Sequence, residues 1–129
     1  MPRYLSPAWF EAAQRAIDAS ASLPATAVGV DIVVQHVVTG AADGDVIYHV
    51  RVAGGGVSVH RGEAPDPTVV FNEDYDTAAA ISRGELSAQS AFITGRIRVR
   101  GDLPRLVEQS SAFSDIDDAL AGLRSETSY

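Results

Sequence analysis

A two-residue alternation of apolar and polar side chains over residues 28–61 limits the fold of this chain more than any other feature. In the first stretch, VGVDIVVQHVVTG, the even positions hold Val28, Val30, Ile32, Val34, His36 and Val38. In the next two stretches, 45–53 and 57–61, valines and Tyr48 again occupy every second position. This period is typical of strands with one buried face. Short turns between the stretches, one of them GGG at 54–56, therefore predict an antiparallel meander of three strands.

The rest of the sequence predicts two more strands and about five helices. The strands cover residues 68–72 and 95–101, and the helices cover residues 7–20, 74–84, 88–92, 103–113 and 115–123. Ser6, Ser87 and Asp102 stand where a helix N-cap is expected. Because only helices remain to cover the apolar strand faces, the sequence predicts an α+β fold. We expect a two-layer sandwich, with helices on one face of a five-stranded, mainly antiparallel sheet.

Length, cysteine content and net charge exclude several classes of protein. The 129 residues fit a single domain over 1–129, and the absence of cysteine excludes disulfides and thiolate chemistry. Ten basic residues against 17 acidic ones give a net charge of −7, which argues against nucleic-acid binding. No apolar run approaches the roughly 20 residues that cross a bilayer, so a cytoplasmic location is expected. All ten basic residues are arginine, which together with abundant alanine is typical of a bacterial, GC-rich genome.

The sequence contains no motif typical of catalysis or of metal binding. His36 falls on the apolar side of its strand, whereas His49 and His60 fall on the polar sides of theirs, so the sequence predicts no metal site. The acidic run NEDYD (72–76) precedes a helix, which favours capping and the helix dipole as its role. Neither a GxSxG elbow nor a phosphate-binding glycine motif occurs. We therefore expect no cofactor and no catalytic residue.

The predicted helices carry more large apolar side chains than a thin layer needs. These are Trp9, Phe10, Ile81, Phe92, Leu106, Phe113 and Leu120. One interpretation is an ordinary close-packed core. The other is a cavity of roughly 300–1,000 Å³ between helices and sheet, able to take an apolar ligand. Periodicity is compatible with both.

The segment PDPTVVFNEDYDTAAAISRGELSAQSAFITGRIRVRGDLPRLVEQ (65–109) resembles the C-terminal half of the sterol carrier protein 2 family, the nonspecific lipid-transfer or sterol-binding domains. The most specific part is the run AQSAF-x-x-GRIRVRGD (88–102). Upstream, the helix and strand order agree with bacterial single-domain members. The resemblance implies an apolar tunnel under the helices that binds a fatty acid, acyl-CoA or sterol without covalent chemistry.

Residues expected to line that tunnel follow from the resemblance and the strand faces. They are Trp9, Phe10, Ala13, Val34, His36, Tyr48, Phe71, Ile81, Gln89, Phe92, Leu106, Val107 and Phe113. His36 and Gln89 are candidates for holding a polar head group. An alternative function is a small pocket enzyme, an isomerase or hydrolase acting on an apolar steroid or acyl substrate. Its mark would be an acid–base pair with perturbed pKa values facing the cavity. A third is an accessory partner of lipid-metabolising enzymes.

Three arginines, Arg96, Arg98 and Arg100, alternate with Ile97 and Val99 in the last predicted strand. We expect the apolar pair to face the helices and the arginines to face away. With Asp31, Gln35 and Arg51, the arginines then belong to a polar sheet face that meets water, as charge runs usually do. The other interpretation is docking on an anionic membrane or partner during lipid exchange. Beyond such transient contacts, a monomer or weak dimer is expected.

Overall fold

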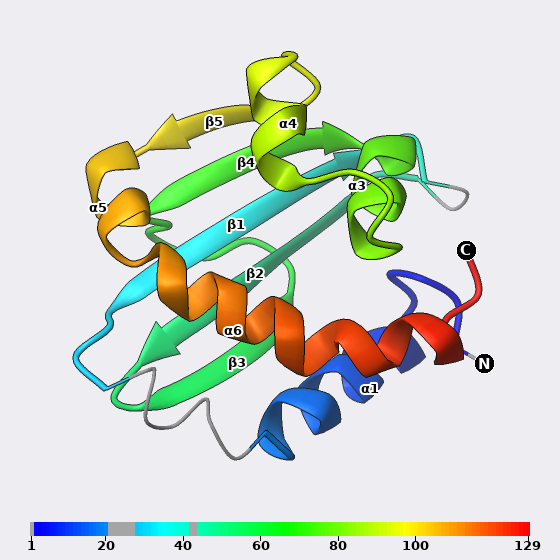
Figure 1. Cartoon of the computed structure of the whole chain (residues 1–129), viewed down its shortest axis with the longest axis horizontal. Helices are drawn as coiled ribbons and strands as arrows, with labels where there is room; N and C mark the ends of the chain where they lie inside the picture. Colours follow the sequence, from blue (N-terminus) through cyan, green and yellow to red (C-terminus); the bar gives the residue numbers. More distant parts are fainter. Residues whose placement is uncertain (1, 21–27, 42–43) are drawn as a thin grey trace.

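The computed structural model describes residues 2–20, 28–41 and 44–129, and a five-stranded sheet forms its base (Figure 1). The strands are β1 (Ile32–Thr39), β2 (Val46–Ala53), β3 (Gly56–Arg61), β4 (Val69–Asp74) and β5 (Arg98–Gly101). Their order is β3-β2-β1-β4-β5. The antiparallel meander β1-β2-β3 is confirmed, and β5 is antiparallel to β4. Only the central pair, β1 and β4, is parallel, so the sheet is mainly antiparallel, as predicted.

Between β3 and β4 the chain crosses the face of the sheet that is turned away from the helices. The amide of Ala64 donates to Oε1 of Gln35 at 2.9 Å, and the amide of Thr68 donates to the carbonyl of Val33 at 2.8 Å. This crossing brings β4 beside β1 in the parallel direction. It also buries Gln35, so the prediction that Gln35 meets water is wrong.

The helices cover the opposite face of the sheet (Figure 1). They are α1 (Pro7–Asp18), α3 (Tyr75–Ser82), α4 (Ala88–Ile93), α5 (Leu103–Glu108), α6 (Ser110–Leu120) and a 3₁₀ helix, η1 (Ala121–Glu126). The N-caps predicted at Ser6, Ser87 and Asp102 are confirmed, because each side chain accepts the amide proton of the third residue onward. Within the described residues, no helix is long and apolar enough to span a bilayer.

The largest differences from the predicted boundaries concern the first strand and the last two helices. The first strand begins at Ile32 instead of residue 28, because Gly29 takes a positive φ of 76° and turns the chain. Val28 is consequently exposed. The helices predicted at 103–113 and 115–123 instead divide at Gln109, whose backbone (φ −108°, ψ 17°) leaves the helical region. No glycine or proline marks that break, so apolar periodicity could not locate it.

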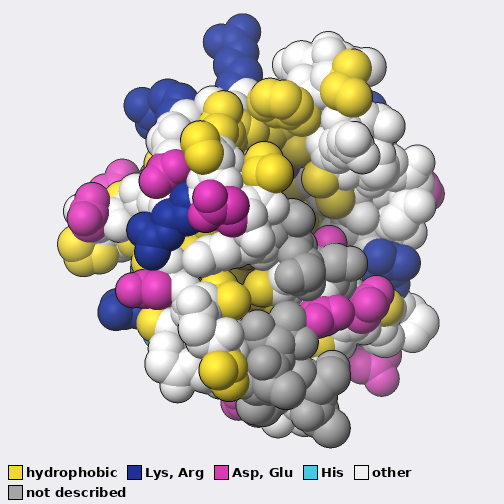
Figure 2. All heavy atoms as spheres, turned by 60° about the vertical axis from the view of Figure 1, so that its left-hand side comes forward, with side chains coloured by type: hydrophobic (Ala, Val, Ile, Leu, Met, Phe, Trp, Pro, Cys, Tyr) yellow, Lys and Arg dark blue, Asp and Glu magenta, His cyan; other side chains and the backbone are white. Residues whose placement is uncertain are grey.

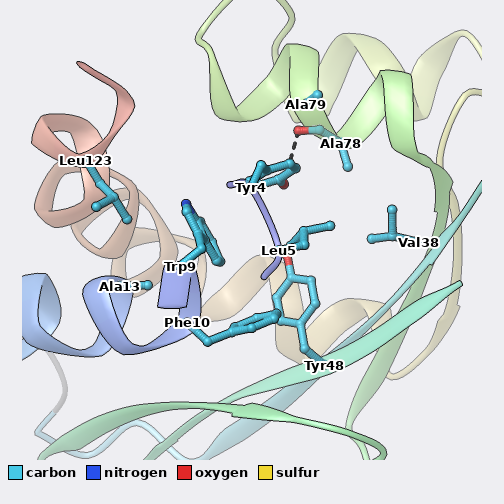
Figure 3. Close-up of a cluster of buried hydrophobic side chains, with 10 residues drawn as sticks. All are labelled: Tyr4, Leu5, Trp9, Phe10, Ala13, Val38, Tyr48, Ala78, Ala79 and Leu123. Carbon is cyan, nitrogen blue, oxygen red and sulfur yellow. Dashed lines mark hydrogen bonds between the residues drawn. The ribbon is translucent and has the colours of Figure 1, made fainter. Parts of the chain in front are cut away.

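An aromatic cluster fills the space between α1 and the sheet (Figure 3). The Trp9 ring contacts Tyr4 edge-on at 5.0 Å between centroids and Phe10 at 5.2 Å. Phe10 in turn contacts Tyr48 of β2 at 5.2 Å. Aromatic pairs of this geometry stabilise by about 0.5–1.5 kcal/mol beyond the area that they bury. The cluster thereby anchors α1 to β2.

The N-cap of α3 should make the stability of the fold depend on pH. Asp74 accepts the amide proton of Thr77 at 2.7 Å, and its hydrogen bonds to the Thr77 side chain and backbone lower the pKa of Asp74. The ionised cap therefore stabilises the fold above the unfolded pKa of about 3.9, and this contribution is lost as pH falls through the folded pKa. We expect Asp74→Ala to cost about 1 kcal/mol at pH 7.

Urea denaturation at pH 7 and near pH 3 measures this effect. The difference in free energy of unfolding between wild type and Asp74→Ala should be smaller at the lower pH. Asp74→Ser serves as the control, since it keeps a capping oxygen but cannot ionise. An equal gap at both pH values would contradict the role of the carboxylate.

Candidate functional site

A cavity of about 340 Å³ lies between the helices and the inner face of the sheet. Its apolar walls are Trp9, Ala13, Val34, Val50, Val59, Phe71, Ala78, Ile81, Ala88, Ile97, Leu106, Phe113, Ile116, Leu120 and Leu123. Val50, Phe71 and Phe113 are only partly buried, although they stand between the two layers. Protein interiors are normally close-packed, so apolar side chains that remain partly exposed between two layers are unusual. Such a surface is suited to binding an apolar ligand.

The floor of the cavity is built by the alternation of three neighbouring strands. His36 on β1 pairs in register with Tyr48 on β2 and with Phe71 on β4. Side chains two residues away along a strand face the same side, which adds Val34, Val50 and Glu73.

A buried polar pair interrupts this apolar floor. His36 Nδ1 lies 3.1 Å from Glu73 Oε1, and the Glu73 side chain is almost fully buried. The His36 ring stacks on Tyr48 at 4.7 Å with an interplanar angle of 5°. A buried carboxylate is costly without a partner, and His36 provides one. The capping role predicted for the acidic run holds for Asp74, but Glu73 instead faces the cavity, two residues after Phe71.

Polar groups also stand where the cavity reaches the surface. Arg124 Nε donates to the carbonyl of Ser82 at 2.6 Å, and the hydroxyl groups of Ser82 and Tyr129 lie 2.7 Å apart. The exposed Asp117 lines the same end, and desolvation by its surroundings raises the pKa of its carboxyl group, against the opposing effects of His36 and Arg124. The cavity lining is therefore mainly apolar, with polar side chains from β1, β4, α3, α6 and η1 set into it.

The sequence profile of the SCP-2 sterol transfer family matches residues 10–114, which is most of the chain. The chain belongs to this family. The resemblance seen over residues 65–109 is thus confirmed, and the match extends upstream through α1 and the meander.

Solved structures share the SCP-2 fold. A crystal structure of sterol carrier protein 2 has 20% identity and a TM-score of 0.73, covering 92% of this chain and 98% of that one. A Thermus thermophilus protein, described as possibly a sterol carrier protein, has 18% identity and a TM-score of 0.74, covering 95% and 91%. Palmitated SCP2L2 from Aedes aegypti has 22% identity and a TM-score of 0.61, covering 84% and 90%. A search of curated proteins found no match.

The SCP-2 cavity brings together most of the residues expected to line it. These are Trp9, Ala13, Val34, His36, Tyr48, Phe71, Ile81, Leu106 and Phe113. Four others lie elsewhere: Phe10 belongs to the aromatic cluster, and Gln89, Phe92 and Val107 are exposed on short helices. These four do not line the cavity in this structure.

Helix rotation explains the misplaced residues on α4 and α5. Ala91 is fully buried, so Phe92, one residue and about 100° further around α4, points outward. On α5, Leu106 faces the cavity, and the same rotation turns Val107 to the surface. The candidate head-group residue Gln89 likewise does not line the cavity, whereas His36 and Glu73 do.

The other histidines of this SCP-2 chain lie apart from the cavity. His49 and His60 stack at 5.1 Å between ring centroids, and neither lines the cavity that holds His36. In the part of the chain that the structure describes, no group of three or more His, Asp or Glu side chains is placed to hold a metal ion.

Proposed function

We propose that this SCP-2 protein binds one apolar lipid molecule in the cavity and carries it without covalent chemistry. The observation that carries the proposal is the cavity of about 340 Å³, whose walls are partly exposed valine, leucine and phenylalanine side chains of both layers. Transfer of apolar surface from water into such a site is favourable by about 25 cal/mol per Å². The family match is consistent with this role.

The ligand is a molecule with a fatty acyl chain or a sterol ring system. The volume lies near the lower end of the roughly 300–1,000 Å³ of small-molecule pockets, which favours a single chain or ring system. The similar Aedes aegypti structure is described as palmitated, which supports an acyl ligand. The polar group of the ligand lies against His36 and Glu73, a polar pair on the cavity floor whose Nδ1 and Oε1 atoms lie 3.1 Å apart.

Direct binding measurements test this proposal. Organic extraction of the purified protein followed by mass spectrometry should reveal co-purified lipid, and titration with a fluorescent fatty acid should saturate at one molecule per chain. Displacement by unlabelled fatty acids and sterols then ranks the ligand classes. A protein that carries no lipid and binds no apolar probe would contradict the proposal.

A proton-transfer enzyme acting on an apolar steroid or acyl substrate is the second candidate function. It is favoured by the His36–Glu73 pair and by Asp117, whose pKa is raised by desolvation, at the same cavity. The discriminating experiment incubates the protein with a 3-keto steroid or an acyl thioester. Turnover that His36→Gln removes without loss of the fold would favour the enzyme. Binding without turnover would exclude it for these substrates.

A further inference from the structure

Exposed apolar side chains gather on the two helices that flank β5. Phe92 and Ile93 at the end of α4 are 50% and 74% exposed, and Leu103 and Val107 of α5 are 38% and 71% exposed. Among the described residues, the one other large apolar side chain exposed to this degree is Val28. A single exposed apolar side chain is ordinary, whereas several at one edge of a sheet mark an interaction site.

The same segment concentrates positive charge in an acidic protein. Residues 92–108 contain four arginines and two carboxylates, a net charge of +2 in a chain of −7. Arg96, Arg98 and Arg100 are all exposed, and Asp102, one of the two carboxylates, caps α5. The partner that complements this segment is therefore anionic, although the rest of the protein repels anions.

Arg98 and Arg100 lie on β5, an edge strand that follows α4 and precedes α5 along the chain. β5 is the last strand of the sheet, and no other strand of the described residues pairs with its outer edge. The register with β4 directs Arg98 and Arg100 to the sheet face opposite the helices, so these arginines and the apolar side chains of α4 and α5 lie on the two sides of this edge. Figure 2 shows dark blue basic side chains next to a group of yellow apolar side chains on one face of the molecule.

This surface also borders the cavity. Ala88 of α4 and Leu106 of α5 line the cavity, and so does Ile97, between Arg96 and Arg98. The helices that carry the exposed apolar side chains therefore form part of the cavity wall. We name the set Phe92, Ile93, Arg96, Arg98, Arg100, Leu103 and Val107 the α4–α5 surface.

We propose that the α4–α5 surface docks on the headgroup region of an anionic phospholipid bilayer. Its apolar side chains enter the boundary between headgroups and acyl chains, and its arginines bind the anionic headgroups. A bilayer fits this surface better than a folded protein partner does. It presents anionic headgroups and an apolar interior together, and it needs no pocket complementary in shape to α4 and α5. Docking places the cavity wall against the lipids.

Vesicle flotation tests the docking directly. The probes are vesicles of phosphatidylcholine alone and of phosphatidylcholine mixed equally with phosphatidylserine. Wild type should bind the anionic vesicles, less strongly at high salt, and should bind the neutral vesicles weakly. Because each arginine near an anionic surface contributes a factor of about five, the triple variant Arg96→Gln/Arg98→Gln/Arg100→Gln should lose about 100-fold in vesicle affinity. Ile93→Ser/Val107→Ser should lose at least about tenfold.

Matched controls lie elsewhere on the protein. Val28→Ser removes an apolar side chain that is 71% exposed, as is that of Val107, and Arg51→Gln removes an exposed arginine of β2. Both should keep vesicle affinity within about twofold. Equal binding to both kinds of vesicle, or an equal loss in the controls, would overturn the proposal. So would a dimer in sedimentation that Val107→Ser dissociates, because the surface would then bind a second copy.

The fluorescent fatty-acid titration, run on every variant, separates docking from ligand binding. We expect unchanged fatty-acid affinity in all of them, since none of the substituted side chains lines the cavity. If wild type binds vesicles but no fatty acid, the proposed function fails and docking stands. If it binds fatty acid but no vesicle, docking fails alone.

Discussion

Replacing Gly101 with alanine should destabilise the protein by at least about 3 kcal/mol, a large part of the stability of a chain this size. Gly101 ends β5 with a φ of 112°, outside the range of residues with a side chain. An added Cβ would overlap the carbonyl oxygen of Thr68 and lie 2.9 Å from Cα of Val69. That carbonyl is held in place, because it accepts the amide proton of Asp102 at 3.0 Å. The alanine variant must therefore separate β5 from β4.

Urea denaturation followed through the fluorescence of Trp9, the single tryptophan, measures the loss. Gly95→Ala is the matched control, since Gly95 also has a positive φ, of 78°, but no atom within 4 Å of an added Cβ. It should cost only about 1 kcal/mol, the strain of the backbone conformation. Equal losses in the two variants would show that contact with Thr68 does not decide the effect.

Filling the cavity with Val50→Trp should weaken binding of a long-chain fatty acid by about 50-fold. Val50 projects from β2 into the cavity and is only partly buried, so a larger ring can enter without displacing the core. The added volume would exclude about three methylene groups of the ligand, at roughly 0.8 kcal/mol each. Displacement of a fluorescent fatty acid measures the affinity, and circular dichroism checks that the fold is kept.

The neighbouring residue supplies the control for cavity filling. Arg51→Trp places the same ring on the opposite, exposed face of β2, and its affinity should equal that of wild type. If Val50→Trp binds fatty acid as tightly as wild type while remaining folded, the ligand does not occupy this cavity. A ligand site on the outer face would instead be revealed by a loss in Arg51→Trp.

The strand pattern predicted which sheet residues face inward, because alternation in a strand is a local property of the backbone. Val34, His36 and Tyr48 lie where that pattern placed them. The caps at Ser6, Ser87 and Asp102 were equally readable, since an N-cap depends on residues within one turn. Errors in placing cavity residues fell mainly on short helices, where one residue of rotation moves a side chain such as Phe92 or Val107 from cavity to solvent.

By itself, the sequence determined the two-layer α+β architecture, the inner faces of the strands and the family resemblance, all of which depend on local periodicity and motif. Only the tertiary structure decided that β4 lies parallel to β1, which brings Glu73 Oε1 to 3.1 Å from His36 Nδ1 on the cavity floor. It also decided that α4 and α5 expose Phe92 and Val107 beside the arginines of β5. Both features join segments far apart along the chain or depend on how a helix is rotated against its neighbours, and hydrophobic periodicity contains no information on either.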